Sequence, residues 1–162
     1  MVEYRLATER DLEQIWARNI EDNPGDDRWI RWREEYIGYN RDRRAETFVV
    51  VVDGEPVGEG TLLYSTDCSA IRGRTFLADG KTVANVNALR ICEAYEGQGH
   101  ISAIHRLMIQ RAAQLGFKRL TIGVEECEMR NRAIYEHWGY ADLIHQEVEN
   151  GEVVLYYSKN IG

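Results

Sequence analysis

The segment YEGQGHISAIHRLM, residues 95–108, joins a glycine-rich turn to the start of an amphipathic helix. Gly97 and Gly99 can adopt backbone angles that other residues resist, and they let a ligand approach the backbone closely. The unpaired N–H groups of the first helical turn point to the same spot, where the positive end of the helix dipole attracts an anion. Ser102 adds a hydroxyl donor. The segment therefore predicts a pyrophosphate cradle, with a purely structural turn as the alternative.

This cradle matches neither of two common nucleotide-binding motifs. Ser102 stands where the Gly-x-Gly-x-x-Gly motif has its third glycine, and no Gly-Lys-Ser/Thr follows as in a P-loop. Glu96 lies beside the glycines and would repel a diphosphate from an inward position, so we expect its carboxylate to point outward. His100 opens the helix, where it either donates to a phosphate or lies in solvent.

Tyr135 is a second candidate for chemistry, in the middle of the segment NRAIYEHWGY, residues 131–140. Asn131 lies one helical turn before it, so both side chains share one face of the helix. A buried tyrosine hydroxyl needs a hydrogen-bond partner. That partner is either a ligand atom or an ordinary group of the core.

Periodicity and turn signals outline the elements that must position these residues. The expected strands span residues 2–7, 47–52, 56–64, 82–91, 119–124, 141–148 and 153–158, and the expected helices span about 9–20, 28–39, 99–115 and 129–138. Residues 65–80 are polar and irregular, and we expect an insertion or a flexible loop there. Together the elements predict one α+β domain over residues 1–162, with a mixed, mostly antiparallel sheet of about six to seven strands flanked by about four helices.

Composition and charge narrow the class of protein. The 162 residues carry 44% hydrophobic residues and a net charge of −7, which fits one globular domain and argues against a nucleic-acid partner. The acidic balance suits an amine-bearing partner. Charges throughout the N-terminal segment predict no signal peptide and no membrane partner, and hence a cytoplasmic location. The three cysteines have no CxxC spacing and predict neither a disulfide framework nor a metal site. The choice between monomer and homodimer stays open.

Taken in order, these segments resemble the GNAT acyltransferase superfamily. The family's L-x-V-x-P-x-x-R-G-x-G-x-G/A motif is similar to LRICEAYEGQGHIS, residues 89–102, and its Y-x-x-x-G-F/Y ending is similar to residues 135–140. The matching positions are Leu89, Ile91, Tyr95, Gly97, Gly99, Tyr135, Gly139 and Tyr140. The turn DGEPVG, residues 53–58, and the opening YRLATERDL, residues 4–12, are similar too, so the resemblance spans nearly the whole chain.

The resemblance implies an acetyl-CoA site, with no metal, in a splay between the fourth and fifth strands. Pantetheine would bond to backbone groups of Leu89, Arg90 and Ile91. The pyrophosphate would lie on the amides of Gly97, Gln98, Gly99, His100, Ile101 and Ser102. Tyr135 would stand near the thioester sulfur and protonate the leaving thiolate.

Three positions depart from the family pattern. Glu96 replaces the usual Arg or Gln, and Ile101 replaces the third small residue. Glu128 replaces the Asn that usually lies seven residues before the tyrosine, and Asn131 is the displaced candidate for that cofactor contact. Because backbone amides donate whatever their side chain, the cradle tolerates the first two changes better than the third.

The resemblance implies an N-acetyltransferase that transfers an acetyl group to a primary amine of a small molecule or peptide by direct attack on the thioester. Glu59 on the strand at 56–64 is the candidate base, with a water relay, positioned by Asn87, as an equal alternative. Trp29, Trp32 and Tyr36 form an aromatic stripe that either holds the amine by cation–π contact or packs on the sheet. A non-catalytic acyl-CoA-binding or sensing module is the alternative function.

Overall fold

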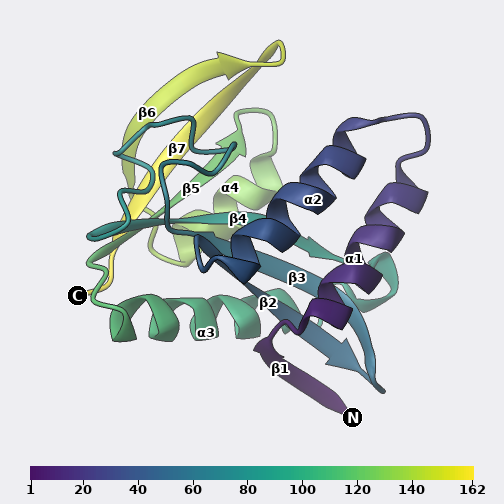
Figure 1. The fold of residues 1–162 in the computed structure, drawn as a ribbon. Helices are drawn as coiled ribbons and strands as arrows, with labels where there is room; N and C mark the ends of the chain where they lie inside the picture. The colour runs from purple at the N-terminus through teal and green to yellow at the C-terminus, as the bar shows by residue number, and fades with distance from the viewer.

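The computed structural model describes residues 1–162 as a seven-stranded sheet flanked by four helices (Figure 1). The strands are β1 (Val2–Leu6), β2 (Ala45–Val52), β3 (Glu55–Leu63), β4 (Val83–Ile91), β5 (Arg119–Glu125), β6 (Asp142–Glu149) and β7 (Glu152–Asn160). The helices are α1 (Glu9–Asp22), α2 (Arg28–Arg41), α3 (His100–Gln114) and α4 (Met129–His137), and a short 3-10 helix, η1 (Glu93–Tyr95), lies before α3. The sheet order is β1-β2-β3-β4-β5-β7-β6, and only β4 and β5 pair in parallel. The predicted fold class is confirmed.

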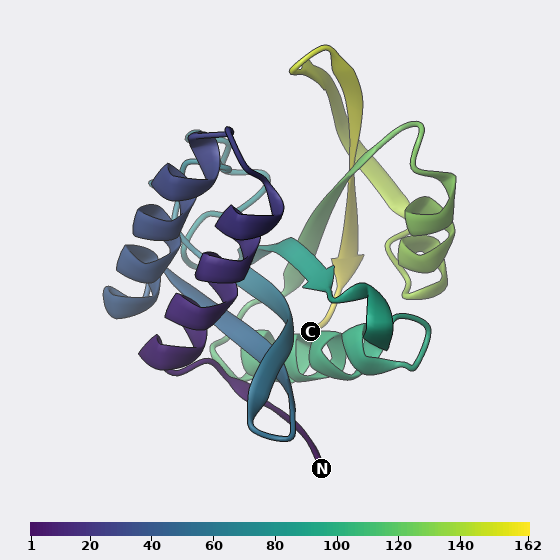
Figure 2. The same ribbon diagram turned by 90° about the vertical axis from the view of Figure 1, so that its right-hand side faces the viewer.

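The helices cover the two faces of the sheet unequally. Helices α1 and α2 lie on one face and α3 lies on the other (Figure 2). Both faces are covered because strand β2 is apolar on both sides. Phe48 and Val50 belong to the core under α3, whereas Val49 and Val51 pack with Ile15 of α1. A strand buried on both faces reads as a continuous apolar run rather than an alternating one.

The centre of the sheet opens where β4 leaves β5. The parallel ladder runs only from Val83 to Val86 on β4, and the rest of β4 pairs with β3 alone. A register shift opposite Gly60 and a positive φ of 56° at Ala88 mark a bulge in β4 at this point. Gly60 makes room for the bulge, since a Cβ there would lie 2.7 Å from a Leu89 methyl carbon. The predicted splay between the fourth and fifth strands is therefore confirmed.

Residues 65–80 differ from the expected flexible insertion. The segment has no helix or strand, but Cys68, Ile71, Leu77 and Ala78 are fully buried in the core shared with α1 and α2. These four residues follow neither a helical nor a strand period, so periodicity gave no sign of their burial. The segment is an ordered part of the core. None of the helices combines the length and apolarity that crossing a bilayer requires.

A buried histidine joins α3 to the end of α4. His105 Nε2 and the Tyr140 hydroxyl share a hydrogen bond of 2.8 Å, and the imidazole stacks on Trp138 with ring centroids 4.1 Å apart. Burial lowers the pKa of His105 to about 4, and the nearby charges of Lys159 and Arg106 add to the effect. The ring is therefore neutral at physiological pH and holds the C-terminal end of α4 on α3.

We predict that His105→Asn reduces the loss of stability in acid. An unfolded histidine has a pKa near 6.5 and the folded one a pKa of about 4. Between these values the unfolded chain binds the extra proton, so the free energy of unfolding of the wild type falls as pH drops, by up to about 3 kcal/mol. Urea unfolding from about pH 7.5 to about pH 4.5 measures how steeply the free energy of unfolding changes with pH in the wild type and in the variant. The buried carboxylates contribute equally to both proteins, so a difference between the two slopes comes from His105. Equal slopes would show that His105 is not the titrating group.

Candidate functional site

Two cavities meet at the splay between β4 and β5. The first, which we call the glycine-turn cavity, has a volume of 830 Å³ and lies between the end of β4, the turn before α3, and α4. The second, which we call the α2 cavity, has a volume of 620 Å³ and lies on the α2 side of the same opening. Leu89, Arg90 and Tyr135 line both cavities. A ligand in one cavity therefore meets a ligand in the other at these three residues.

The turn before α3 presents six consecutive N–H groups without a protein acceptor. None of the backbone amides from Gly97 to Ser102 donates a hydrogen bond to another group of the chain, and the first amide of α3 to do so is that of Ala103, to Gly99 O. Gly97 and Gly99 have φ values of 71° and 83°, in the left-handed region that favours glycine. A buried N–H needs an acceptor, so a run of free donors at a helix N-terminus indicates a bound anion.

The cofactor residues predicted from the sequence lie together, with one exception. Those lining the glycine-turn cavity are Leu89, Arg90, Ile91, Gly97, Gly99, His100, Ile101, Ser102 and Asn131. Gln98 does not line it, since its side chain donates to Ala94 O at 3.3 Å. Arg130 and His137 also line it and were missed, although they share the helical face of Ile134. That i, i+4, i+7 spacing is the signal that could have found them.

His100 is buried rather than solvated. Its Nδ1 shares a hydrogen bond of 2.9 Å with the Tyr4 hydroxyl, and its Nε2 shares one of 3.2 Å with Gln98 Oε1. With both ring nitrogens engaged, the imidazole fixes the turn against β1 and has no free nitrogen for a ligand. Glu96 is exposed on the cavity wall and has no ion pair within the chain, so its carboxylate adds a negative charge beside the cradle.

Tyr135 offers a free hydroxyl at the meeting point of the cavities. It is half-buried beside Trp138, with ring centroids 5.7 Å apart, and its hydroxyl makes no hydrogen bond with another residue. Burial raises the pKa of Tyr135 to about 12, and the negative charge of Glu128 adds to the rise. The phenol therefore keeps its proton across the physiological range and is able to donate it to a ligand atom.

Glu59 lies under Arg90 rather than in either cavity. Its carboxylate is 3.3 Å from Arg90 Nη1 and accepts a hydrogen bond of 3.0 Å from Asn19 Nδ2, while its Oε1 has no partner. Burial raises the pKa of Glu59, and the charge of Arg90 opposes the rise. The carboxylate faces a separate small cavity of 180 Å³ on the α1 side of the sheet.

The predicted acceptor residues divide between two places. Trp32, Tyr36 and Asn87 line the α2 cavity, where the Tyr36 hydroxyl donates to Asn87 Oδ1 at 2.6 Å. Trp29 lines the small cavity instead, and Arg90 lies over its ring at 4.9 Å. The aromatic stripe thus packs inside the molecule and also contributes to a cavity. Packing on the sheet and a place in a binding cavity are therefore compatible for these residues.

Two carboxylates on the wall of the α2 cavity have no cationic partner. Its four arginines, Arg28, Arg31, Arg72 and Arg90, each have a carboxylate within ion-pair distance. Glu125 and Glu128 lie on the wall near Tyr135, and neither has a cationic partner within the chain. Glu125 and Glu128 therefore form a locally negative stretch of wall, which favours a cationic ligand there. Sequence patterns did not reveal this, because the two residues reach the cavity only through the path of β5.

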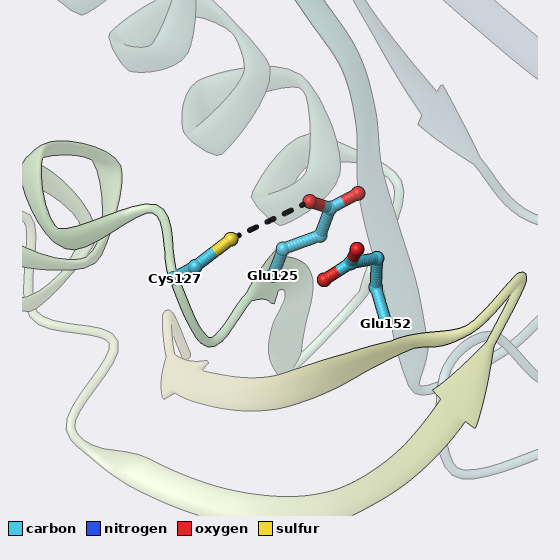
Figure 3. Close-up of side chains that lie close together, drawn as sticks. All are labelled: Glu125, Cys127 and Glu152. Atoms are coloured by element: carbon cyan, nitrogen blue, oxygen red, sulfur yellow. Dashed lines mark hydrogen bonds between the residues drawn. The ribbon is translucent and has the colours of Figure 1, made fainter.

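A thiol and two carboxylates gather at the outer end of β5 (Figure 3). Ligand-type atoms of Glu125, Cys127 and Glu152 lie within 4.8 Å of one another, and Cys127 Sγ donates to Glu125 at 3.8 Å. Cys127 and Glu152 are exposed, and no buried polar atom points into the group. Exposed acidic groups often gather without an ion, so the cluster does not support a metal site.

Comparisons with known proteins place this geometry in a family. Residues 8–140 match the acetyltransferase (GNAT) family, so the chain belongs to it. No curated protein matches the sequence closely enough to count as a relative.

Solved structures with the same fold include several acetyltransferases. An N-acetyltransferase from Staphylococcus aureus Mu50 aligns with a TM-score of 0.73 at 14% identity, over 100% of this chain and 99% of that one. The ribosomal-protein-alanine N-acetyltransferase from Brucella melitensis gives 0.70 at 17% identity, over 98% and 99%. Arabidopsis thaliana NAA60, solved with a bisubstrate analogue, gives 0.70 at 14% identity, over 100% and 99%. At these identities the likeness shows the fold alone.

We predict that Arg90→Met destabilises the protein by about 2 kcal/mol, because it leaves the buried Glu59 carboxylate without its cation. Methionine is an unbranched side chain too, but it lacks the guanidinium that lies over the rings of Trp16 and Trp29 at 5.5 and 4.9 Å. The double variant Glu59→Leu/Arg90→Met should regain most of the loss, since no buried charge remains. Urea unfolding measures all three proteins, with Arg106→Met on the exposed side of α3 as the control. If Arg90→Met were as stable as the wild type, the ion pair between Glu59 and Arg90 would not stabilise the fold.

Proposed function

We propose that this protein transfers an acetyl group from acetyl-CoA to a primary amine of a small molecule or peptide, by direct attack of the amine on the thioester. The observation that carries the proposal is the meeting of the two cavities at Tyr135. One cavity offers six free amides for an anion, and the other has two carboxylates without a cationic partner, Glu125 and Glu128, for a cation.

The groups that line the glycine-turn cavity support acetyl-CoA as the donor. The amides from Gly97 to Ser102 would hold the pyrophosphate without help from side chains. The β4 segment from Leu89 to Ile91 has no strand on its β5 side, so it would pair with pantetheine as with a further strand. Asn131 on α4 would close the opposite wall. Each contact uses a group that lacks a partner within the chain or faces the cavity.

Tyr135 would act in the chemical step. As the amine attacks, the new C–N bond forms and the C–S bond breaks, and the sulfur leaves with a negative charge. The Tyr135 hydroxyl would donate a hydrogen bond to that sulfur and then transfer its proton to it. The attacking nitrogen would in turn give a proton to the Tyr135 phenolate. A backbone N–H of the opened β4, such as that of Ile91, would polarise the carbonyl oxygen. Holding the two substrates together contributes roughly 7–11 kcal/mol at best.

The amine must lose a proton before or during the attack. Arg90 separates Glu59 from both cavities, so Glu59 would act as a positioning residue for Arg90 rather than take that proton directly. Water in the α2 cavity, ordered by Asn87, would instead carry the proton toward the unpaired carboxylates Glu125 and Glu128. The same carboxylates would attract the amine in its ammonium form.

A non-catalytic acyl-CoA sensor is the second candidate. The exposed Glu96 beside the cradle favours it, because a carboxylate there weakens the attraction for a diphosphate. The free hydroxyl of Tyr135 favours the enzyme, since a sensor does not need a proton donor at the thioester. Calorimetry with acetyl-CoA followed by a thiol-release assay separates the two, because only the enzyme releases CoA in the presence of an amine.

We predict that Tyr135→Phe lowers turnover about 100-fold, the usual scale for loss of a proton donor. Because the hydroxyl has no protein partner, the variant should fold normally and keep its affinity for acetyl-CoA. Thiol release measures turnover and calorimetry measures affinity. Tyr157→Phe on β7, away from both main cavities, is the control. Wild-type turnover in Tyr135→Phe would rule out the role as acid.

We also predict that Gly99→Val weakens acetyl-CoA binding about tenfold or more, because valine strains a residue at φ 83° that aligns the free amides. A Cβ at Gly99 would meet no protein atom, so the effect comes from the backbone rather than from crowding in the fold. Gly25→Val is the matched control, since Gly25 has φ 81° and open space but lies in the α1–α2 loop. If both folded variants bind acetyl-CoA equally well, the turn is not the cradle.

A further inference from the structure

The segment 65–80 is tied to the β6–β7 hairpin by four ion pairs. Arg72 Nη2 lies 2.9 Å from a Glu147 oxygen and 2.7 Å from a Glu149 oxygen. Arg74 lies 3.0 Å from Glu147 through Nη1 and 3.7 Å from Glu149 through Nη2. We call these four side chains the arginine–glutamate bridge. It connects residues that are far apart in sequence and lie side by side at the upper left of Figure 1.

Both ends of the bridge are held in place. Arg74 is mostly buried, donates to the carbonyl oxygens of Ile71 and Ala70 at 3.0 and 2.9 Å, and lies over the Tyr156 ring at 5.1 Å. The Tyr156 hydroxyl donates to Glu149. Arg72, by contrast, is half-exposed, and its guanidinium contacts only the two glutamates. Arg72 is therefore the member whose removal disturbs the bridge with least harm to the core.

The bridge lies in the wall of the α2 cavity. Ala70 and Arg72 line the cavity from the segment 65–80, and Glu149 and Tyr156 line it from the hairpin. Across the cavity stand Trp32 and Tyr36 of α2, with β4 and β5 as the floor. These four are the only ion pairs between the segment and the hairpin, which also meet where the Phe76 ring lies 4.7 Å from that of His145.

We propose that the arginine–glutamate bridge makes the α2 cavity a bounded pocket for the amine of a compact small molecule, and so excludes polypeptide acceptors. The inference rests on the proposed function. A cavity of 620 Å³ is within the usual size of small-molecule sites. A polypeptide extends by about 3.3–3.6 Å per residue beyond its amine and needs an open groove to leave the site. With the bridge formed, the segment and the hairpin make one continuous wall instead.

The test compares acceptor size preference in the wild type and in Arg72→Ala. Thiol release from acetyl-CoA is measured with primary amines graded from ethanolamine and phenethylamine to tetrapeptides with a free α-amino group. Exposed ion pairs contribute modestly, so we expect the ratio of kcat/KM for tetrapeptides to that for small amines to rise roughly fivefold in the variant. Affinity for acetyl-CoA should not change. High salt should shift the wild type in the same direction, because it screens exposed charges.

Two further variants keep the result interpretable. Arg72→Lys retains the positive charge and should stay close to the wild type. Arg43→Ala is the matched control, because Arg43 also is exposed with a positive φ, 59° against 52° for Arg72, but lies away from the cavity. An unchanged size preference in Arg72→Ala, or a wild type that already prefers tetrapeptides, would overturn the bridge proposal alone. A wild type that binds no acetyl-CoA, or acetylates none of the amines, would overturn the proposed function and this inference with it.

Discussion

The short parallel ladder between β4 and β5 is the constraint on which the whole site depends. Four residues of β4, from Val83 to Val86, pair with β5, and the bulge at Ala88 then turns the strand away. Backbone groups that a sheet would normally satisfy are left facing a cavity, and an unsatisfied buried group is costly. The fold tolerates this opening because α3 and the segment 65–80 hold the two halves of the sheet from opposite faces.

The opening explains why the free amides and the acidic wall lie on opposite sides of one gap. The end of β4 leads directly through η1 into the glycine turn, so the free amides follow the free strand edge along the chain. Strand β5 leads to Glu125, Glu128 and α4, so the acidic wall and Tyr135 come from the other side of the same gap. His105 holds the end of α4 through its hydrogen bond with Tyr140. This contact fixes the position of Tyr135 beside the opening. One divergence of two strands thus brings the free amides, the acidic wall and Tyr135 to a single opening, where we propose that the two substrates meet.

Local features of the sequence predicted the fold and half of the site. Glycines, helix periodicity and β-branched runs depend on neighbours in the chain, so they indicated most of the elements, the turn before α3 and the helical face of Tyr135. The splay followed only from the family resemblance. Burial of Ile71 and Leu77, the ion pair of Glu59 with Arg90, and the contacts of Arg72 with the hairpin depend on residues far apart in sequence. No short-range pattern encodes such contacts. For that reason the sequence did not predict the ion pair of Glu59 or the ordered packing of residues 65–80.

We propose that the amides after β4 bind the pyrophosphate of acetyl-CoA while the free edge of β4 holds its pantetheine arm. Titration of ¹⁵N-labelled protein with acetyl-CoA, followed by amide NMR, tests both parts in one measurement. We expect the largest shift changes at Gly97 to Ser102 and along Leu89 to Ile91, with small changes in α1 and β1. Saturating acetyl-CoA that leaves these amides unmoved, or moves only amides elsewhere, would contradict the account.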